Sequence, residues 1–237
     1  MIQEPLKYLS ELVKTQANGE AAVQSLIAKT MKQSGCEVEL YDYLPSEVPV
    51  KGEFSTEKAD NVQRRSVLIA TAKGDPTLPS LLIFAHPDCE PVKNSEKWSS
   101  NPFSAVSNNG KLFGWGVADD LAGCACALSA VKVTLERKRA SLGDVIFAST
   151  PSKNYARGVA AILHRGLTAD ASLYLHPAES GQGMCEIKAV ASGQLEFSIS
   201  VIGSAPDTTE PGHTAFSHLA VNPIDKAIKV IGALYQL

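Results

Sequence analysis

The stretch Leu81-Leu82-Ile83-Phe84-Ala85-His86-Pro87-Asp88 decides the fold class of this chain. Its run of consecutive apolar residues is typical of a strand buried on both faces of a sheet. Pro87 has no amide hydrogen to donate, so we expect the strand to end at His86. Ligands of open α/β sheets bind just beyond the carboxyl ends of the strands. Two interpretations follow: His86 is a metal ligand oriented by Asp88, or it is an ordinary strand-end histidine capped by a nearby carboxylate.

The overall composition narrows the function classes. The chain has 237 residues, of which 44% are hydrophobic and 20% charged, enough for one large or two small globular domains. Its net charge of -3, without a basic block, argues against a nucleic-acid partner. No apolar run approaches the roughly 18 residues of a membrane span, and residues 1–5 lack the pattern of a signal peptide. We therefore expect a cytoplasmic protein with no nucleic-acid or membrane partner.

The cysteines do not form a recognisable pattern. They are Cys36, Cys89, Cys124, Cys126 and Cys185. Their odd number and irregular spacing argue against a disulfide framework or a structural zinc site. Cys124 and Cys126 lie in a predicted helix, where positions two apart point to different faces, so we interpret them as small core residues.

Apolar spacing predicts strands and helices that alternate along the chain. The predicted strands are residues 37–43, 66–72, 81–86, 144–149 and 171–176. Helices are predicted within 6–34, with a break at Asn18-Gly19, and at 121–135, 155–165 and 222–237. This alternation indicates an α/β fold with a mainly parallel sheet flanked by helices. Strand 66–72 is a candidate antiparallel neighbour of strand 81–86, because a short turn joins them.

The pattern changes near residue 193. Residues 194–201 alternate strictly between polar and apolar, as a half-exposed strand does. A loop with two prolines and two histidines follows, and then the last predicted helix. We interpret this region as the start of a second domain with an open-faced sheet.

Two histidines and two aspartates form the candidate site. His86 and His176 each end a predicted strand and each precede a proline, whereas Asp119 and Asp120 follow a Gly-Trp-Gly turn. Two imidazoles and a carboxylate at the carboxyl edge of one sheet suit zinc or a similar divalent ion. Asp88 is placed to hydrogen-bond the far nitrogen of His86 and to fix its tautomer.

Four motifs, in order, resemble those of the M20 family of metallohydrolases, which includes desuccinylases, deacetylases, aminoacylases and carboxypeptidases. His86-Pro87-Asp88 resembles the family's His-x-Asp after a hydrophobic strand, and Trp98–Phe103 resembles its Trp-x-x-(Asp/Asn)-Pro-Phe. Residues 110–120 resemble its glycine-rich segment that ends in Asp, and residues 212–224 resemble the lid segment of the desuccinylases. The similarity runs from residue 6 to the end of the chain.

The resemblance implies a fold and an activity. It implies a zinc-peptidase-like catalytic domain over residues 1–190 and part of a smaller α+β lid or dimerisation domain over residues 191–237. The family hydrolyses an amide bond of an N-acyl amino acid or small peptide by metal-activated water. We therefore expect one or two zinc ions, with cobalt or manganese as alternatives, and a homodimer formed through the lid.

The resemblance also implies roles for single residues. His86 would bind one metal and Asp119 would bridge two, while Asp88 would orient His86. His176 occupies the place of the acidic ligand of the family's second metal, and Glu179 is an alternative ligand and our candidate for the general base. His213 matches the lid histidine that polarises the substrate carbonyl in the partner's site; its other interpretation is a polar loop tip.

The chain departs from the family in two respects. The family's general base is the first of two adjacent glutamates, but here Ser152 and Lys153 fall near those positions, and no acid lies between Asp144 and Asp170. Family members also return from the lid to the catalytic domain and add a last metal-binding histidine. Because this chain stops at Leu237, it is either a fragment or an unusually short protein, and we expect a fragment.

Three functions therefore stay open. The first is a zinc hydrolase of the M20 type. The second is a catalytically impaired homologue that binds a small ligand or a partner through the same cleft. The third is a serine or lysine hydrolase that uses Thr150-Pro151-Ser152-Lys153, a string that resembles a lactamase motif.

Overall fold

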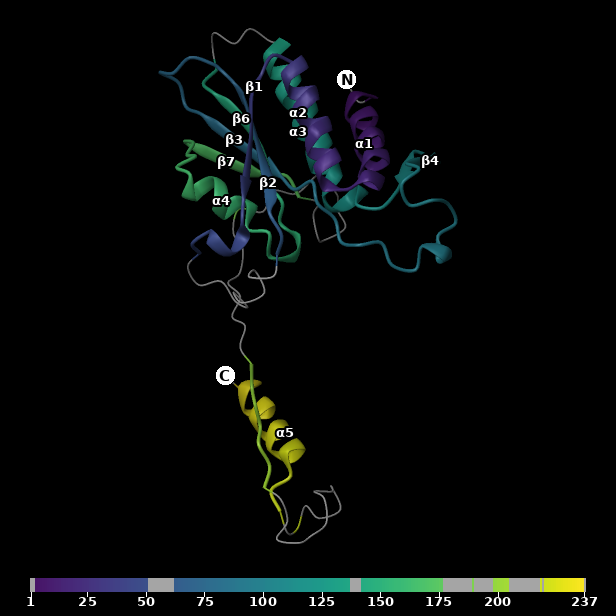
Figure 1. The fold of residues 1–237 in the computed structure, drawn as a ribbon, viewed down its shortest axis with the longest axis vertical. Coiled ribbons are helices and arrows are strands. Elements are labelled where there is room, and N and C mark those ends of the chain that lie inside the picture. The colour runs from purple at the N-terminus through teal and green to yellow at the C-terminus, as the bar shows by residue number, and fades with distance from the viewer. Residues whose placement is uncertain are drawn as a thin grey trace. The chain divides into compact units, whose positions relative to one another are not determined.

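Figure 1 shows the fold in a computed structural model, which describes residues 3–50, 62–136, 142–176, 189, 198–204, 218 and 220–236. The chain divides into two compact units, Met1–Ala191 and Ser192–Leu237. The assignment of the second unit to a lid domain stays a prediction.

Over the residues that the structure describes, the first unit is built on a sheet of five strands in the order β1-β2-β6-β3-β7. The strands are β1 (Glu37–Tyr43), β2 (Arg65–Ala72), β3 (Leu81–Ala85), β6 (Val145–Ser149) and β7 (Ala171–Tyr174). β3 runs parallel to β6 and β7, whereas β2 runs antiparallel to β1 and β6. All strands except β2 therefore point in one direction. The predicted α/β fold with a mainly parallel sheet is confirmed.

The expected pairing of strand 66–72 with strand 81–86 is wrong. β6 lies between them, with Ala70 opposite Phe147 on one side and Ile83 opposite Phe147 on the other. Every residue of β6 is buried, so this strand belongs at the centre of the sheet. Adjacent position in the sequence favours direct pairing, but here the burial of β6 outweighs it.

Helices cover both faces of the sheet. They are α1 (Gln3–Thr15), α2 (Glu20–Gln33), α3 (Ala122–Glu136) and α4 (Gly158–His164). The predicted break between the first two helices is confirmed, and Gly19 adopts a φ of 88° there, a conformation that suits glycine. α1, α2 and α3 lie on one side of the sheet and α4 lies on the other (Figure 1).

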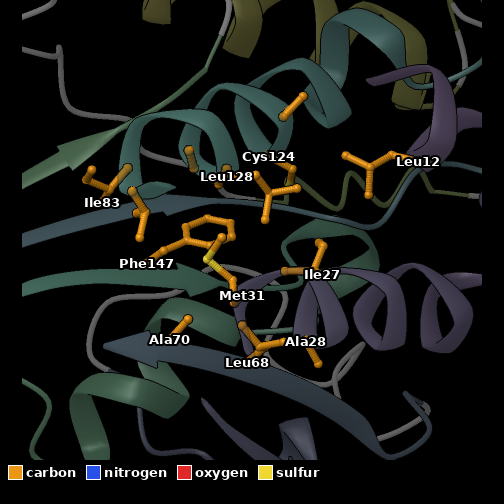
Figure 2. Close-up of a cluster of buried hydrophobic side chains, with 14 of the residues drawn as sticks. Leu12, Ile27, Ala28, Met31, Leu68, Ala70, Ile83, Cys124, Leu128 and Phe147 are labelled. Atoms are coloured by element: carbon orange, nitrogen blue, oxygen red, sulfur yellow. The ribbon is translucent and has the colours of Figure 1, made fainter. Parts of the chain in front are cut away.

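Alternate residues of the central strands belong to two hydrophobic clusters, one on each face of the sheet. Ile83 and Phe147 point to the α1, α2 and α3 side, while Leu82 and Ile146 point to the α4 side. This period of two is what a strand buried on both faces requires. Figure 2 shows the larger cluster, in which Phe147 lies among side chains from the helices and the sheet. Cys124 is buried in this cluster, as predicted, whereas Cys126 is half-buried and lies outside it, so its assignment to the core is wrong.

β7 differs from the predicted buried strand. Its residues Ala171–Tyr174 are exposed, because β7 lies at the edge of the sheet described. β7 is nevertheless paired in parallel with β3, and the Tyr174 ring also stacks on the Phe84 ring of β3 with 4.8 Å between the centroids. β7 is thereby fixed beside β3, which brings the residues that follow the two strands close together.

In the second unit the structure describes one helix, α5 (Pro223–Leu234). Asn222 caps its first turn, since its side-chain oxygen accepts a hydrogen bond from the Ile224 amide at 2.9 Å. The predicted final helix is thus confirmed over most of its length. Of the predicted strand at 194–201, residues 198–201 form no strand and the rest lies outside the described residues. None of the helices that the structure describes is long and apolar enough to cross a lipid bilayer.

Candidate metal centre

The candidate site lies at the carboxyl edge of the parallel strands. β3 ends at Ala85, directly before His86, and β7 ends two residues before His176. The loop after β6, which ends at Ser149, carries Lys153 to the same edge. Because the strands run parallel, their carboxyl ends meet and the residues that follow them converge.

His86 is buried and supported by Asp88. Its Nδ1 lies 3.0 Å from the Asp88 carbonyl oxygen and 3.3 Å from the Asp88 carboxylate. The carboxylate in turn accepts backbone hydrogen bonds from Ser152 at 2.9 Å and Lys153 at 2.7 Å. With these acceptors around Nδ1, the proton belongs on Nδ1 and the lone pair of Nε2 faces the site. This is the support that a metal-binding imidazole usually has.

The surroundings also shift the pKa of His86. Burial of the imidazole acts to lower its pKa, but the hydrogen bond to Asp88 and the negative charges of Asp120 and Asp88 outweigh burial. The pKa of His86 therefore lies above its ordinary value. The ring sits in a negative environment that suits a cation.

Asp119 is brought to His86 by the segment after a short hairpin. Strands β4 (Val106–Asn108) and β5 (Lys111–Phe113) form the hairpin, and a turn at Val117–Leu121, in which Asp119 and Asp120 have non-helical backbone angles, leads into α3. Gly116, at the start of this turn, has a φ of 72°, and a side chain there would meet the Cys89 sulfur at 2.2 Å. Glycine is therefore required at this position.

The Asp119 carboxylate has a different environment at each oxygen. Oδ1 lies 2.8 Å from His86 Nε2 and 3.3 Å from His176 Nε2, while Oδ2 accepts a hydrogen bond from the Lys153 ammonium at 2.5 Å. Burial acts to raise the pKa of Asp119, but the hydrogen bond and charge of Lys153 and the two imidazoles outweigh burial and lower it. The Asp119 carboxyl group is therefore ionised at neutral pH.

The residues present fit a divalent ion. One ligand atom from each of His86, Asp119 and His176 lies within 4.8 Å of the others. Tetrahedral ligands at roughly 2.1 Å from zinc are about 3.4 Å apart. The 3.3 Å between His176 and Asp119 matches this spacing, and the 2.8 Å between His86 and Asp119 would lengthen slightly. Two nitrogens and one oxygen also leave a position for a further ligand.

Asp120 holds the backbone of the site. Its buried carboxylate accepts hydrogen bonds from the His86 amide and the Gly123 amide, both at 3.2 Å. Burial, only partly offset by His86, raises the pKa of Asp120 to about 6. A side chain at Gly123 would meet the Asp120 carboxylate at 2.4 Å. Asp120 therefore links the end of β3 to the start of α3, and its carboxylate oxygens are used in these two backbone hydrogen bonds.

Replacing Asp88 with alanine is expected to weaken zinc affinity by about 10–100-fold, the usual cost of losing a group that orients a ligand. The reason is that His86 loses the carboxylate beside Nδ1 and two loop amides lose their acceptor. Competition against a zinc-sensitive dye measures the change. The control is Asp75→Ala, which removes a carboxylate bound to Thr77 at an exposed turn. Equal zinc affinity in both variants would contradict the role of Asp88.

Comparison with known proteins identifies the family. The model of peptidase family M20/M25/M40 matches residues 82–232, more than half of the chain. This chain belongs to the M20 family. The matched region contains every residue of the candidate metal site, and the family implies use of a divalent metal.

Relatives of known name show how much of an M20 protein this chain spans. It is 27% identical over 226 residues to the N-formyl-4-amino-5-aminomethyl-2-methylpyrimidine deformylase of Bacillus subtilis, covering 93% of this chain and 48% of that protein. It is 31% identical over 165 residues to the succinyl-diaminopimelate desuccinylase of Legionella pneumophila, covering 66% of this chain and 42% of that protein. The chain therefore spans less than half the length of each of these relatives.

A solved structure supports the M20 fold. The M20 family metallo-carboxypeptidase Sso-CP2 of Sulfolobus solfataricus superposes with a TM-score of 0.55 at 20% identity. The superposition covers 72% of this chain and 37% of that one. At this identity the likeness concerns the fold alone.

The structure brings four of the predicted residues of this M20 member together: His86, Asp88, Asp119 and His176. Glu179 and His213 lie outside the described residues, so their roles stay predictions. Lys153 was placed by sequence near the family's paired glutamates, but its ion pair with Asp119 was not foreseen. The signal that could have revealed it is a lysine where the family keeps an acid beside its metals.

Two open hollows flank the site of this M20 chain. One, of about 370 Å³, is lined by Asp119, Trp98 and Trp115, whose rings meet edge to face. The other, of about 560 Å³, is lined by the loop after β6, including Lys153. Glu90 lines both hollows and its side chain is exposed. Asp119 thus borders the first hollow, and Lys153, its ion-pair partner, borders the second.

Proposed function

We propose that this protein is a metal-dependent hydrolase that cleaves an amide bond of an N-acyl amino acid or small peptide. The observation that carries the proposal is the convergence of His86, Asp119 and His176 on one ion-sized position. The names of two relatives support cleavage of an N-acyl amide: one is a deformylase of an N-formyl aminopyrimidine and the other a desuccinylase of succinyl-diaminopimelate. We favour zinc over cobalt or manganese, since two imidazoles and a carboxylate form a common catalytic zinc site.

The chain's own residues have distinct tasks in this reaction. A divalent ion held by His86, Asp119 and His176 would supply Lewis acidity for the attack of water on the amide carbonyl. Asp88 positions His86 so that Nε2 faces the reaction. The Lys153 ammonium donates a hydrogen bond to the second oxygen of Asp119 and balances its negative charge.

The general base is a separate part of the proposal, because the family's paired glutamates are replaced here. Glu179 is the base that we favour from the sequence. Glu90 is the alternative that the hollows support, since its exposed side chain borders both of them. Glu179→Gln and Glu90→Gln distinguish these candidates: the variant that loses most of kcat at unchanged metal content identifies the base.

Activity of the purified chain tests the function. We expect it to hydrolyse at least one member of a panel of N-formyl, N-acetyl and N-succinyl amino acids and dipeptides after loading with zinc, cobalt or manganese. A chelator should abolish the activity and added metal should restore it. His176→Ala should be inactive, whereas His164→Ala, an exposed helix histidine outside the site, should be unaffected. Normal metal binding without turnover of any substrate in the panel would instead favour a binding function.

Two contacts disfavour the serine or lysine hydrolase. Thr150 is 1% exposed, with its hydroxyl turned toward the Ala85 carbonyl at 3.5 Å. The Lys153 ammonium contacts the Asp119 carboxylate. If this reading were nevertheless correct, Ser152→Ala would remove an activity that chelators leave untouched.

A further inference from the structure

The two oxygens of the Asp119 carboxylate serve two different positive partners. Oδ1 faces His86 and His176, the side on which a metal ion fits, and Oδ2 contacts the Lys153 ammonium at 2.5 Å. In two-metal hydrolase sites the ions lie roughly 3.5–4 Å apart, so that a carboxylate between them gives one oxygen to each. Here an ammonium group stands at the second oxygen.

Lys153 is held in this position by the loop after β6. Its backbone amide donates to Asp88 at 2.7 Å, and the Gly158 amide closes the loop onto the Pro151 carbonyl at 2.9 Å. Its side chain is only 23% exposed, which is low for a lysine. Asp88 therefore supports both His86 and Lys153, so that the imidazole and the ammonium are positioned by the same carboxylate.

We propose that the Lys153 ammonium takes the place of a second metal ion, so that the protein binds one divalent ion, at His86, Asp119 and His176. The inference rests on the proposed metal-dependent function. A second ion at Oδ2 would have to displace the Lys153 ammonium, which is hydrogen-bonded to that oxygen. The ion would also be repelled by the positive charge of Lys153, at the position where it needs a further ligand. The single positive charge of the Lys153 side chain thus replaces the double positive charge of a second metal ion.

The charge balance supports this assignment. Of the acids that meet at the site, Asp88 is occupied by two backbone amides, and Asp120 by two others. Asp119 is therefore the described carboxylate that faces the cations directly. Asp88, Asp119 and Asp120 together bring three negative charges to the site, which one divalent ion and one ammonium balance, whereas a second divalent ion would leave an excess of positive charge.

Metal stoichiometry tests the proposal without reference to activity. The full chain, stripped of metal with a chelator, is titrated with CoCl2 and ZnCl2 by calorimetry, and the metal retained after dialysis is measured. We expect one equivalent for the wild type even at excess metal. Lys153→Glu supplies a carboxylate and should bind two, with spin coupling between the cobalt ions in electron paramagnetic resonance. Lys153→Met removes the repelling charge and should tighten the first site by roughly tenfold.

The control is Lys73→Glu, because Lys73 also pairs with an aspartate, Asp144, at 2.9 Å, but away from the site. It should bind one equivalent with wild-type affinity. Two equivalents in the wild type would overturn the inference and leave the proposed function standing, whereas no binding at all would overturn both. Lys153 variants that behave like Lys73→Glu would also overturn it. Lys153→Met keeps the length of the side chain and so decides the question even if Lys153→Glu does not fold.

Discussion

His86→Ala is expected to lower zinc affinity by at least about a hundredfold. Structural zinc sites bind with roughly 10–16 kcal/mol, so that one ligand accounts for about 3 kcal/mol. His86 is 1% exposed, its Nε2 faces Asp119, and its Nδ1 is held by Asp88. A water molecule can replace the lost imidazole nitrogen only partly, and among the described residues it leaves His176 and Asp119 to hold the ion.

Competition between the protein and a chelating dye for zinc measures this change. The matched control is His164→Ala, at an exposed position of α4, which should keep wild-type affinity. Because a buried side chain is removed, the far-ultraviolet circular dichroism of His86→Ala is compared with that of the metal-free wild type. A folded His86→Ala whose zinc affinity stays within about threefold of the wild type is incompatible with His86 as a ligand.

Phe147→Ala is expected to lower the free energy of unfolding by about 3–5 kcal/mol, the usual cost of truncating a buried aromatic ring. Phe147 is 0% exposed and lies in the middle of β6, which is itself the middle strand of the sheet. The cavity would open on the face of the sheet that α1, α2 and α3 cover, within the cluster where Figure 2 shows the Phe147 ring. The surrounding layers cannot collapse into it without moving the sheet.

Denaturant unfolding of the chain measures this loss. Phe113→Ala is the control, because Phe113 is 50% exposed on the β5 hairpin strand, and a change there should stay within about 0.5 kcal/mol. A loss below about 1.5 kcal/mol for Phe147→Ala would contradict the central position of β6.

The elements of the first unit could be predicted because each carries a local signal. The apolar run Leu81–Ala85 and the period of helices α1 and α2 reflect burial, which depends on the sequence close by. The order of the strands could not be predicted in the same way. β6 enters between β2 and β3 from far along the chain, and apolar runs contain no information on which neighbour they pair with. The exposure of β7 has the same origin, because only the sheet order makes it an edge.

The candidate site also contains residues that a local sequence signal predicts and a contact that only the folded structure shows. Strand ends before proline pointed to His86 and His176, and the glycine-rich turn pointed to Asp119. The sequence places Lys153 where the family keeps an acid, but this position alone does not predict the contact with Asp119, because a lysine after a strand is usually a solvated surface residue. Only the folded loop, fixed by Asp88, shows that its ammonium turns inward.

The central claim is that His86, Asp119 and His176 hold a divalent ion. Anomalous diffraction at the zinc absorption edge, from crystals soaked in zinc chloride, tests it most directly. We predict a single peak about 2.1 Å from His86 Nε2, His176 Nε2 and an Asp119 oxygen. A map without a peak at this position, at zinc concentrations that saturate the protein in solution, would contradict the account.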